Sequence, residues 1–444
     1  MNLSFADRKY VWHPFTQMQE WSNSNKPVIV RGDGFYLIDE HGKKFLDGIA
    51  SMWCNVWGHG NNEISKAMIK QIQTIQHSTL FGLANAPSSE LSEMLIRLAK
   101  GMSHVFYSDN GSTAIEVAMK MALQYWKNRG KKRKTKFVSM ENGYHGDTMG
   151  AMSLGYLPKY FAPYLPLLRR AIKIPLPVCK SGYSDCQDYE NLCLEKTEVI
   201  LANNSSHCCA LVMESGAQIA GGVSIFPRNY QNKVGELCRK YDVLLILDEI
   251  ATGFGRLGNM LEYLEQKSYP DIVCLGKALT GGYSPLAVTL TTNSIFNAFL
   301  GKPTEYKQLY HGHTFTGHPI GCAAAIANIQ MYKKYDLLRN IRQNSVYITH
   351  RLREIQHSPI AENIRSKGLL GGIDLSKAKR PILKLGNGVP ITSYIAKESL
   401  SMGVFLRSLG NTIVIIPPLA IGKRDLKFLL DTIASLVNKI EKFA

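Results

Sequence analysis

The chain has 444 residues, more than one compact core usually holds, so we expect two or three domains or lobes. Apolar residues make up 45% of it, which excludes a disordered chain and favours a well-packed globule. The formal charge is +17, but the basic residues are spread along the sequence. Their one dense run, at 131–134, lies in a polar gap, so we interpret it as a solvated loop and expect no nucleic-acid partner.

No apolar run reaches the length of a membrane span, and the first residues lack the apolar core of a signal peptide. We therefore expect a soluble cytoplasmic protein without a membrane partner. The nine cysteines are odd in number and contain no CxxC pair, which predicts free thiols in a reducing compartment. No cluster has metal-ligand spacing, so no metal is expected.

In chain order, residues 28–47 have the pattern of a β-hairpin, and 62–76 and 88–100 have helical spacing. From residue 105 onward, short apolar strands alternate with loops and helices. The expected strands are 105–107, 137–140, 210–213, 243–247, 272–275 and 287–290, and a strong helix is expected at 114–127. This alternation predicts an α/β domain with a mostly parallel sheet.

Residues 155–205 are less regular, and we interpret them as an insertion with one helix. A long helical stretch is expected from about 320 to 356. The tail has an α+β pattern, with strands at 373–375, 404–406 and 412–414 and helices at 391–402 and 423–442. We therefore divide the chain into an N-terminal segment 1–60 that joins the small domain, a large domain 61–330, and a C-terminal small domain 331–444.

Four features follow strands or begin helices, where ligands bind in open α/β sheets. Gly111-Ser112 opens a helix, whose free N–H groups suit a phosphate, although an ordinary helix cap explains the same residues. Tyr144 in a glycine-rich loop can stack on a flat ring, or lie in a plain turn. Asp248 follows a buried strand, as a loop cap or as the partner of a protonated ring nitrogen.

The fourth feature is Lys277, which follows another apolar strand among small residues. Most lysines are solvated surface residues, but one in this setting is a candidate for an imine-forming amine. One ligand meets three of these features, the helix start, Asp248 and Lys277, because it has a phosphate, a cationic aromatic ring and an aldehyde. Pyridoxal phosphate is such a ligand, and we expect it as the cofactor.

The runs 247–256 and 275–282 resemble the class III (ω-type) aminotransferases of the fold-type I pyridoxal-phosphate enzymes, and the resemblance covers nearly the whole chain. It implies a large domain with a mostly parallel central sheet and a smaller α+β domain from both ends of the chain. Five further runs are similar to the branch of the family that converts 8-amino-7-oxononanoate to 7,8-diaminononanoate in biotin biosynthesis: 12–18, 118–126, 142–148, 311–319 and 403–407.

The resemblance implies catalytic roles for Lys277 as the Schiff-base lysine, Asp248 as the partner of the pyridine nitrogen, and Tyr144. It also implies a set of cofactor-binding residues: Gly111, Ser112, Tyr144, Asp248, Ile250, Lys277 and, from the neighbouring subunit of a homodimer, Thr314. Substrate-binding roles are implied for Trp53, Asp147, Arg256 and Arg407, the last for the substrate carboxylate. Glu214 and Gln218 match acidic and amide positions near the cofactor.

The amino donor is expected to be S-adenosylmethionine, but two positions differ from members that use it. Met52 stands where those members usually have Trp, and Phe15 where they usually have Tyr. The run 77–80 resembles a branch that uses lysine, so lysine stays open as the donor. A different ω-aminotransferase, acting on ornithine, 4-aminobutyrate or a diamine, and a non-catalytic protein of the same fold are the alternatives.

Overall fold

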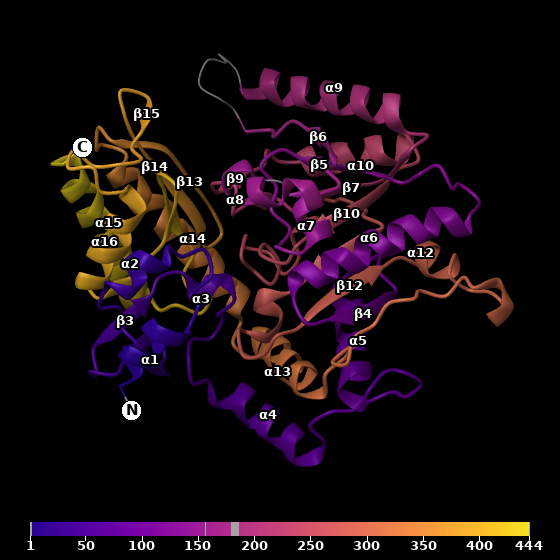
Figure 1. The fold of residues 1–444 in the computed structure, drawn as a ribbon, viewed down its shortest axis with the longest axis horizontal. Helices are drawn as coiled ribbons and strands as arrows, with labels where there is room; N and C mark the ends of the chain where they lie inside the picture. Colours follow the sequence, from indigo (N-terminus) through magenta and orange to yellow (C-terminus); the bar gives the residue numbers. More distant parts are fainter. Residues whose placement is uncertain (1, 156, 179–185, 444) are drawn as a thin grey trace.

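A seven-stranded sheet forms the centre of the larger lobe (Figure 1) in a computed structural model that describes residues 2–155, 157–178 and 186–443. The strand order is β4-β12-β11-β10-β7-β5-β6. The strands are β4 (His104–Ser108), β5 (Lys136–Met140), β6 (Ile172–Ile174), β7 (Cys208–Glu214), β10 (Leu244–Asp248), β11 (Ile272–Leu275) and β12 (Ala287–Thr291). Neighbours from β6 to β11 run parallel, whereas β12 is antiparallel to both β11 and β4. The mostly parallel sheet is therefore confirmed.

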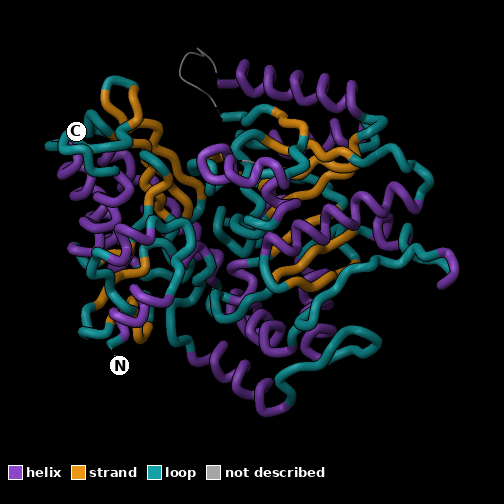
Figure 2. Tube along the Cα trace, viewed as in Figure 1, coloured by secondary structure: helices purple, strands orange, loops and turns teal. Residues whose placement is uncertain are grey.

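Both faces of this sheet are buried, as the apolar run of β10 predicted. Leu244 and Ile246 belong to the core cluster that includes helix α6 (Gly111–Asn128), whereas Leu245 and Leu247 belong to the cluster that includes α10 (Tyr230–Lys240). This alternation follows from the two-residue period of a strand. Helices therefore cover the sheet on two sides, with the strands enclosed between them (Figure 2).

The other large-lobe helices lie around this core. They are α4 (Asn62–Thr74), α5 (Ala86–Leu98), α7 (Met149–Leu154), α8 (Pro158–Phe161), α9 (Cys186–Asn204), α11 (Glu262–Glu265), α12 (Asn293–Asn297) and α13 (Pro319–Lys334). The described part of the chain also has 3₁₀ segments at η1 (Ala162–Leu167), η2 (Lys277–Thr280) and η3 (Pro303–Glu305), and β8 (Ala217–Gln218) pairs with β9 (Ser224–Ile225). No helix among the described residues is long and apolar enough to cross a membrane.

The smaller lobe combines both ends of the chain, whose termini lie on the same side of the molecule (Figure 1). One sheet has the order β1-β2-β3-β16, and β3 pairs in parallel with β16. A second sheet has the order β13-β14-β18-β17, with β15 beside β14. The strands are β1 (Ile29–Asp33), β2 (Tyr36–Asp39), β3 (Lys44–Asp47), β13 (Ala361–Lys367), β14 (Leu370–Lys377), β15 (Arg380–Pro381), β16 (Val404–Phe405), β17 (Ser408–Leu409) and β18 (Thr412–Ile415). The helices are α1 (Leu3–Tyr10), α2 (Met18–Ser22), α3 (Ala50–Trp53), α14 (Leu337–Ile355), α15 (Ile391–Ser401) and α16 (Lys423–Glu441).

Three expectations need correction. The helical stretch 320–356 is two helices, α13 and α14, because the chain turns at Asp336, which has a φ of 46°. The region 155–205 contributes β6 to the central sheet in addition to one long helix, so it is more than an insertion. Among the cysteines that the structure describes, seven are free thiols, but Cys186 is disulfide-bonded, so the expectation of free thiols is wrong there.

Candidate active site

A cavity of about 720 Å³ lies at the carboxyl ends of β10 and β11 and at the start of α6. Most of the residues predicted to act together line it: Trp53, Gly111, Ser112, Tyr144, Asp147, Glu214, Asp248, Ile250 and Lys277. They come from six separate stretches of sequence. The cavity stands where an open α/β sheet is expected to bind its ligand.

Lys277 follows Gly276 at the end of β11 and begins the η2 segment with a φ of 43°. Burial lowers the pKa of its ammonium group, and the carboxylates of Asp248 and Glu214 oppose this shift only in part. A lowered pKa increases the fraction of neutral amine, which is the nucleophilic form. The Lys277 Nζ atom lies 5.4 Å from the centre of the Trp53 ring.

Asp248 ends β10 and has only 5% of its surface exposed. Its Oδ1 accepts a hydrogen bond of 2.9 Å from the Ile250 N–H, and its Oδ2 lies 2.8 Å from Nδ1 of His145. A buried carboxylate needs such partners. His145 is itself 3% exposed, and no described residue hydrogen-bonds its Nε2. No role was predicted for His145 from the sequence, although its place beside Tyr144 in the loop after β5 was the available signal.

An acidic and an amide side chain hold the loop that carries Tyr144 through hydrogen bonds to backbone groups. The Tyr144 N–H donates to Glu214 Oε1 at 2.9 Å, and the Ile219 N–H donates to Oε2 at 3.1 Å. Burial and the nearby Asp248 raise the pKa of Glu214 to about 8. Gln218 donates to the Glu141 carbonyl at 2.9 Å. Glu214 and Gln218 therefore fix the loop.

Two groups at the front of this loop face the cavity. The Tyr144 ring stacks on Phe161 with centroids 6.3 Å apart. Desolvation of the Asp147 carboxyl group raises its pKa, and a hydrogen bond from Tyr144 opposes this shift only in part. An aromatic ring beside a titratable carboxyl group suits a ligand with a flat ring and a cationic substituent.

The first turn of α6 forms the opposite end of the cavity. Asn110 caps the helix by accepting the Thr113 N–H at 3.0 Å, and Ser112 Oγ lies 2.7 Å from Thr148 Oγ1. A Cβ atom added to Gly111 would meet Ile250 Cγ2 at 2.7 Å, so only glycine lets Ile250 lie so close. Free N–H groups, hydroxyl groups and a positive helix end together suit a phosphate.

Trp53 comes from a turn of unusual backbone. Ala50, Ser51, Met52 and Trp53 all have positive φ values, from 45° to 75°. Such left-handed residues cost roughly 1–2 kcal/mol each, so surrounding contacts must hold them. Both the N–H and the hydroxyl of Ser51 donate to the buried Asp47 carboxylate, at 2.9 and 2.7 Å. This turn could not be predicted from residue propensities, because left-handed backbone is usually signalled by glycine and the turn contains none.

Four predicted residues do not line the cavity: Gln218, which fixes the loop of Tyr144, and the three described next. Arg256 is buried and donates hydrogen bonds to the carbonyl groups of Leu369 and Pro417 in the smaller lobe, so these bonds connect the two lobes. Arg407 is exposed, with its Nη1 3.6 Å from the Met52 sulfur beside Trp53. Thr314 is exposed on the segment between β12 and α13.

The residues in this cavity fit pyridoxal phosphate. The lysine suits its aldehyde, the buried aspartate its ring nitrogen, and the α6 terminus its phosphate, and the space left by Gly111 would be filled by any Cβ. The family model for aminotransferase class-III matches residues 18–437, and the chain belongs to this family. The class uses pyridoxal phosphate, the cofactor that the residues of this cavity fit.

The chain is similar to individual members over nearly its full length. It is 40% identical to adenosylmethionine-8-amino-7-oxononanoate aminotransferase of Aquifex aeolicus, over 98% of this chain and 97% of that protein. The crystal structure of the protein with the same name from Methanocaldococcus jannaschii has a TM-score of 0.90 at 38% identity, with 99% of both chains covered. A pyridoxal-phosphate-bound amine transaminase from an uncultivated Pseudomonas species has a TM-score of 0.91 at 32% identity, covering 97% and 99%.

Proposed function

We propose that this protein transaminates 8-amino-7-oxononanoate to 7,8-diaminononanoate in biotin biosynthesis, with S-adenosylmethionine as the amino donor. The observation that carries the proposal is the meeting of Lys277, Asp248 and Tyr144 in one cavity. The names of the relatives at 38–40% identity support the choice of substrate.

Each residue of the cavity has a proposed task. Lys277 supplies the amine that attaches the cofactor and then accepts and returns the proton at the reacting carbon. Asp248, held by His145 and by the Ile250 N–H, keeps a negative charge at the buried end of the site. Bound pyridoxal phosphate supplies a ring that stabilises negative charge at the carbon that loses its proton. Tyr144 and Ile250 are proposed to contact the two faces of that ring.

The phosphate is proposed to bind Gly111 and Ser112 at the start of α6. Trp53 and Asp147 are proposed to contact the substrate, because both line the cavity. Arg407 is proposed to bind the carboxylate of the keto acid, since its exposed guanidinium lies beside Met52, next to Trp53, and can grip a carboxylate through two N–H groups. Arg256 is proposed to act there only indirectly, by holding the two lobes together.

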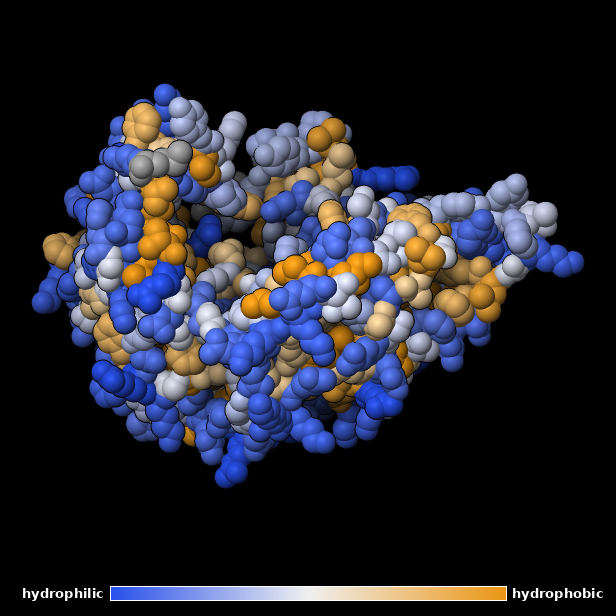
Figure 3. Space-filling view, turned by 90° about the horizontal axis from the view of Figure 1, so that it is seen from below, coloured by the Kyte–Doolittle hydropathy of each residue, from blue (hydrophilic) through white to orange (hydrophobic). Residues whose placement is uncertain are grey.

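We propose a homodimer in which Thr314 of one subunit completes the phosphate site of the other. Exposed apolar side chains support an interface near α4 and the loop after it: Ile69, Ile72, Ile75, Phe81, Leu83 and Phe315. Figure 3, which views the molecule from below, shows hydrophobic side chains gathered at the surface of this face. Such clusters are typical of protein interfaces. A cytoplasmic location and the three-part domain division are part of the same proposal, and the β3–β16 pairing supports the joining of segment 1–60 to the small domain.

The test is product detection by mass spectrometry. Purified protein loaded with pyridoxal phosphate is incubated with 8-amino-7-oxononanoate and either S-adenosylmethionine or lysine. The proposal predicts 7,8-diaminononanoate with S-adenosylmethionine and no product with the Lys277→Ala variant. Product with lysine alone corrects the donor, and Met52 beside Trp53 makes this the second candidate. No product with either donor, but turnover of ornithine, 4-aminobutyrate or a diamine, contradicts the proposed acceptor.

A further inference from the structure

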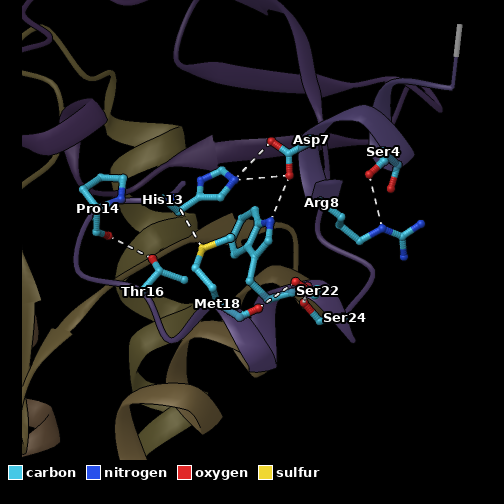
Figure 4. A network of polar contacts seen from close by, with 10 residues as sticks. Ser4, Asp7, Arg8, His13, Pro14, Thr16, Met18, Ser22 and Ser24 are labelled. Atoms are coloured by element: carbon cyan, nitrogen blue, oxygen red, sulfur yellow. Dashed lines mark hydrogen bonds and ion pairs between the residues drawn. The ribbon is translucent and has the colours of Figure 1, made fainter. Parts of the chain in front are cut away.

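The N-terminal segment contains a polar network that the proposed chemistry leaves unexplained (Figure 4). The carboxylate of Asp7 on α1 lies 3.1 and 3.2 Å from Nε2 of His13, and it accepts a hydrogen bond of 2.9 Å from Nε1 of Trp21 on α2. The rings of His13 and Trp21 also contact each other, with centroids 3.9 Å apart. Asp7 therefore joins three points of the segment that are separated in sequence.

This network gives the loop between the two helices a defined shape. The His13 N–H donates to the Met18 sulfur at 3.4 Å, and the Thr16 hydroxyl donates to the Pro14 carbonyl at 2.9 Å. Between them, Phe15 has a φ of 50°, in the left-handed region that side-chain-bearing residues rarely adopt. A strained residue persists only where its surroundings hold it, so the contacts on either side of Phe15 determine where its ring points.

The Phe15 ring reaches the large lobe. It meets Tyr160 of α8 edge to face, with centroids 5.6 Å apart at 85°. Tyr160 packs in the same apolar cluster as Phe161 and Tyr144, and Tyr144 lines the cavity. An apolar cluster that includes Phe161 therefore connects the N-terminal loop, through Tyr160, to Tyr144 in the wall of the active site.

We propose that Asp7 is a positioning residue for substrate binding. By holding His13 and Trp21 it fixes loop 13–18, and the loop presses Phe15 against Tyr160 and so supports the aromatic wall formed by Tyr144. The role rests on the proposed function, because it is measured through turnover of the same site. It explains why a strained, exposed loop is held by several part-buried hydrogen bonds.

The test combines limited proteolysis with steady-state kinetics on the cofactor-loaded protein. Asp7→Ala is expected to speed trypsin cleavage after Arg8 and Lys9 about tenfold, because local opening exposes this segment. It is also expected to raise KM for 8-amino-7-oxononanoate about fivefold while kcat stays within about twofold. Asp33→Ala is the matched control, because Asp33 is an exposed acid whose charged partner, Lys44, lies at 3.9 Å. It should change neither quantity.

A double-mutant cycle separates positioning from general damage. Phe15→Ala is expected to raise KM as much as Asp7→Ala does while leaving α1 as resistant to trypsin as before. The double variant should show a KM no higher than that of Phe15→Ala, because both substitutions abolish the same contact, that of Phe15 with Tyr160. Asp7→Glu keeps the carboxylate, so its KM should lie between the KM of the wild type and that of Asp7→Ala.

The proposal is overturned if Asp7→Ala opens the segment but leaves KM unchanged, or if the two KM effects multiply in the double variant. It is also overturned if KM rises only together with a lower melting temperature and lost cofactor absorbance. Should Asp7→Ala not fold, Asp7→Asn and His13→Ala provide the same comparison. Wild-type protein that does not turn over 8-amino-7-oxononanoate contradicts the proposed function alone, and KM is then compared with 4-aminobutyrate and pyruvate as substrates.

Discussion

Substitution of Gly111 by alanine tests how the cofactor slot is built. The new Cβ would stand 2.7 Å from Ile250 Cγ2 and 2.8 Å from Cδ1. Carbon atoms pack at about 3.5–4.0 Å, so one side must move by close to 1 Å. Ile250 is buried and branched at Cβ, which leaves it few alternative rotamers. The side chain is therefore expected to move into the cavity that it lines.

Forcing one extra carbon into a packed site costs typically 1–3 kcal/mol, and 1.4 kcal/mol is a factor of ten in binding. We expect the Kd for pyridoxal phosphate to rise roughly 5- to 150-fold, as measured by titrating cofactor-free protein and following absorbance. Gly422→Ala is the control, because Gly422 has an ordinary φ of −75° and no atom near its would-be Cβ. A Kd within twofold of wild type for Gly111→Ala would refute the packing argument.

Three further variants probe the groups around the cofactor. His145→Gln removes a 2.8 Å partner of the buried Asp248. A hydrogen bond to a charged group contributes about 1.5–3 kcal/mol, so the Kd for the cofactor should rise at least roughly tenfold in the same titration. An unchanged Kd would show that His145 does not support cofactor binding. Arg407→Ala should raise KM for the keto acid about tenfold with little change in kcat; an unchanged KM places the carboxylate elsewhere. Glu214 has its pKa raised to about 8 from 4.5, so the folded state binds more protons between these values and the wild type loses stability as pH rises from 5 to 8. Relative to Glu214→Gln, the melting temperature of cofactor-free wild type should fall over this range, and a constant difference contradicts the shift.

The parts of the fold and site that sequence patterns predicted are those set by local rules. Asp248 and Lys277 each follow a wholly apolar strand, and buried parallel strands place their carboxyl ends at one edge. The direction of β12 was not predicted, although residues 276–286 are too few for the crossover that a parallel strand needs. The break at Asp336 was missed because apolar residues continue with helical spacing on both sides of it.

Contacts between distant segments could not be predicted in the same way. His145 contacts Asp248 although the two are 103 positions apart in the sequence. No local feature of a histidine in a glycine-rich loop indicates that it has a buried partner. The left-handed turn before Trp53 depends on the buried Asp47 rather than on its own residue types. Phe15 meets Tyr160 of α8, which is far away in the sequence. Tertiary contacts override local preference at these positions, which lie at or beside the candidate site.

The central claim is that Lys277 is the residue to which pyridoxal phosphate attaches. The most direct measurement is borohydride reduction of the cofactor-loaded protein, followed by proteolysis and mass spectrometry of the peptide that carries the pyridoxyl group. Attachment at Lys277, and its absence from the Lys277→Arg variant, is the predicted result. A pyridoxyl group on any other lysine, or none on the wild-type protein, would contradict the account.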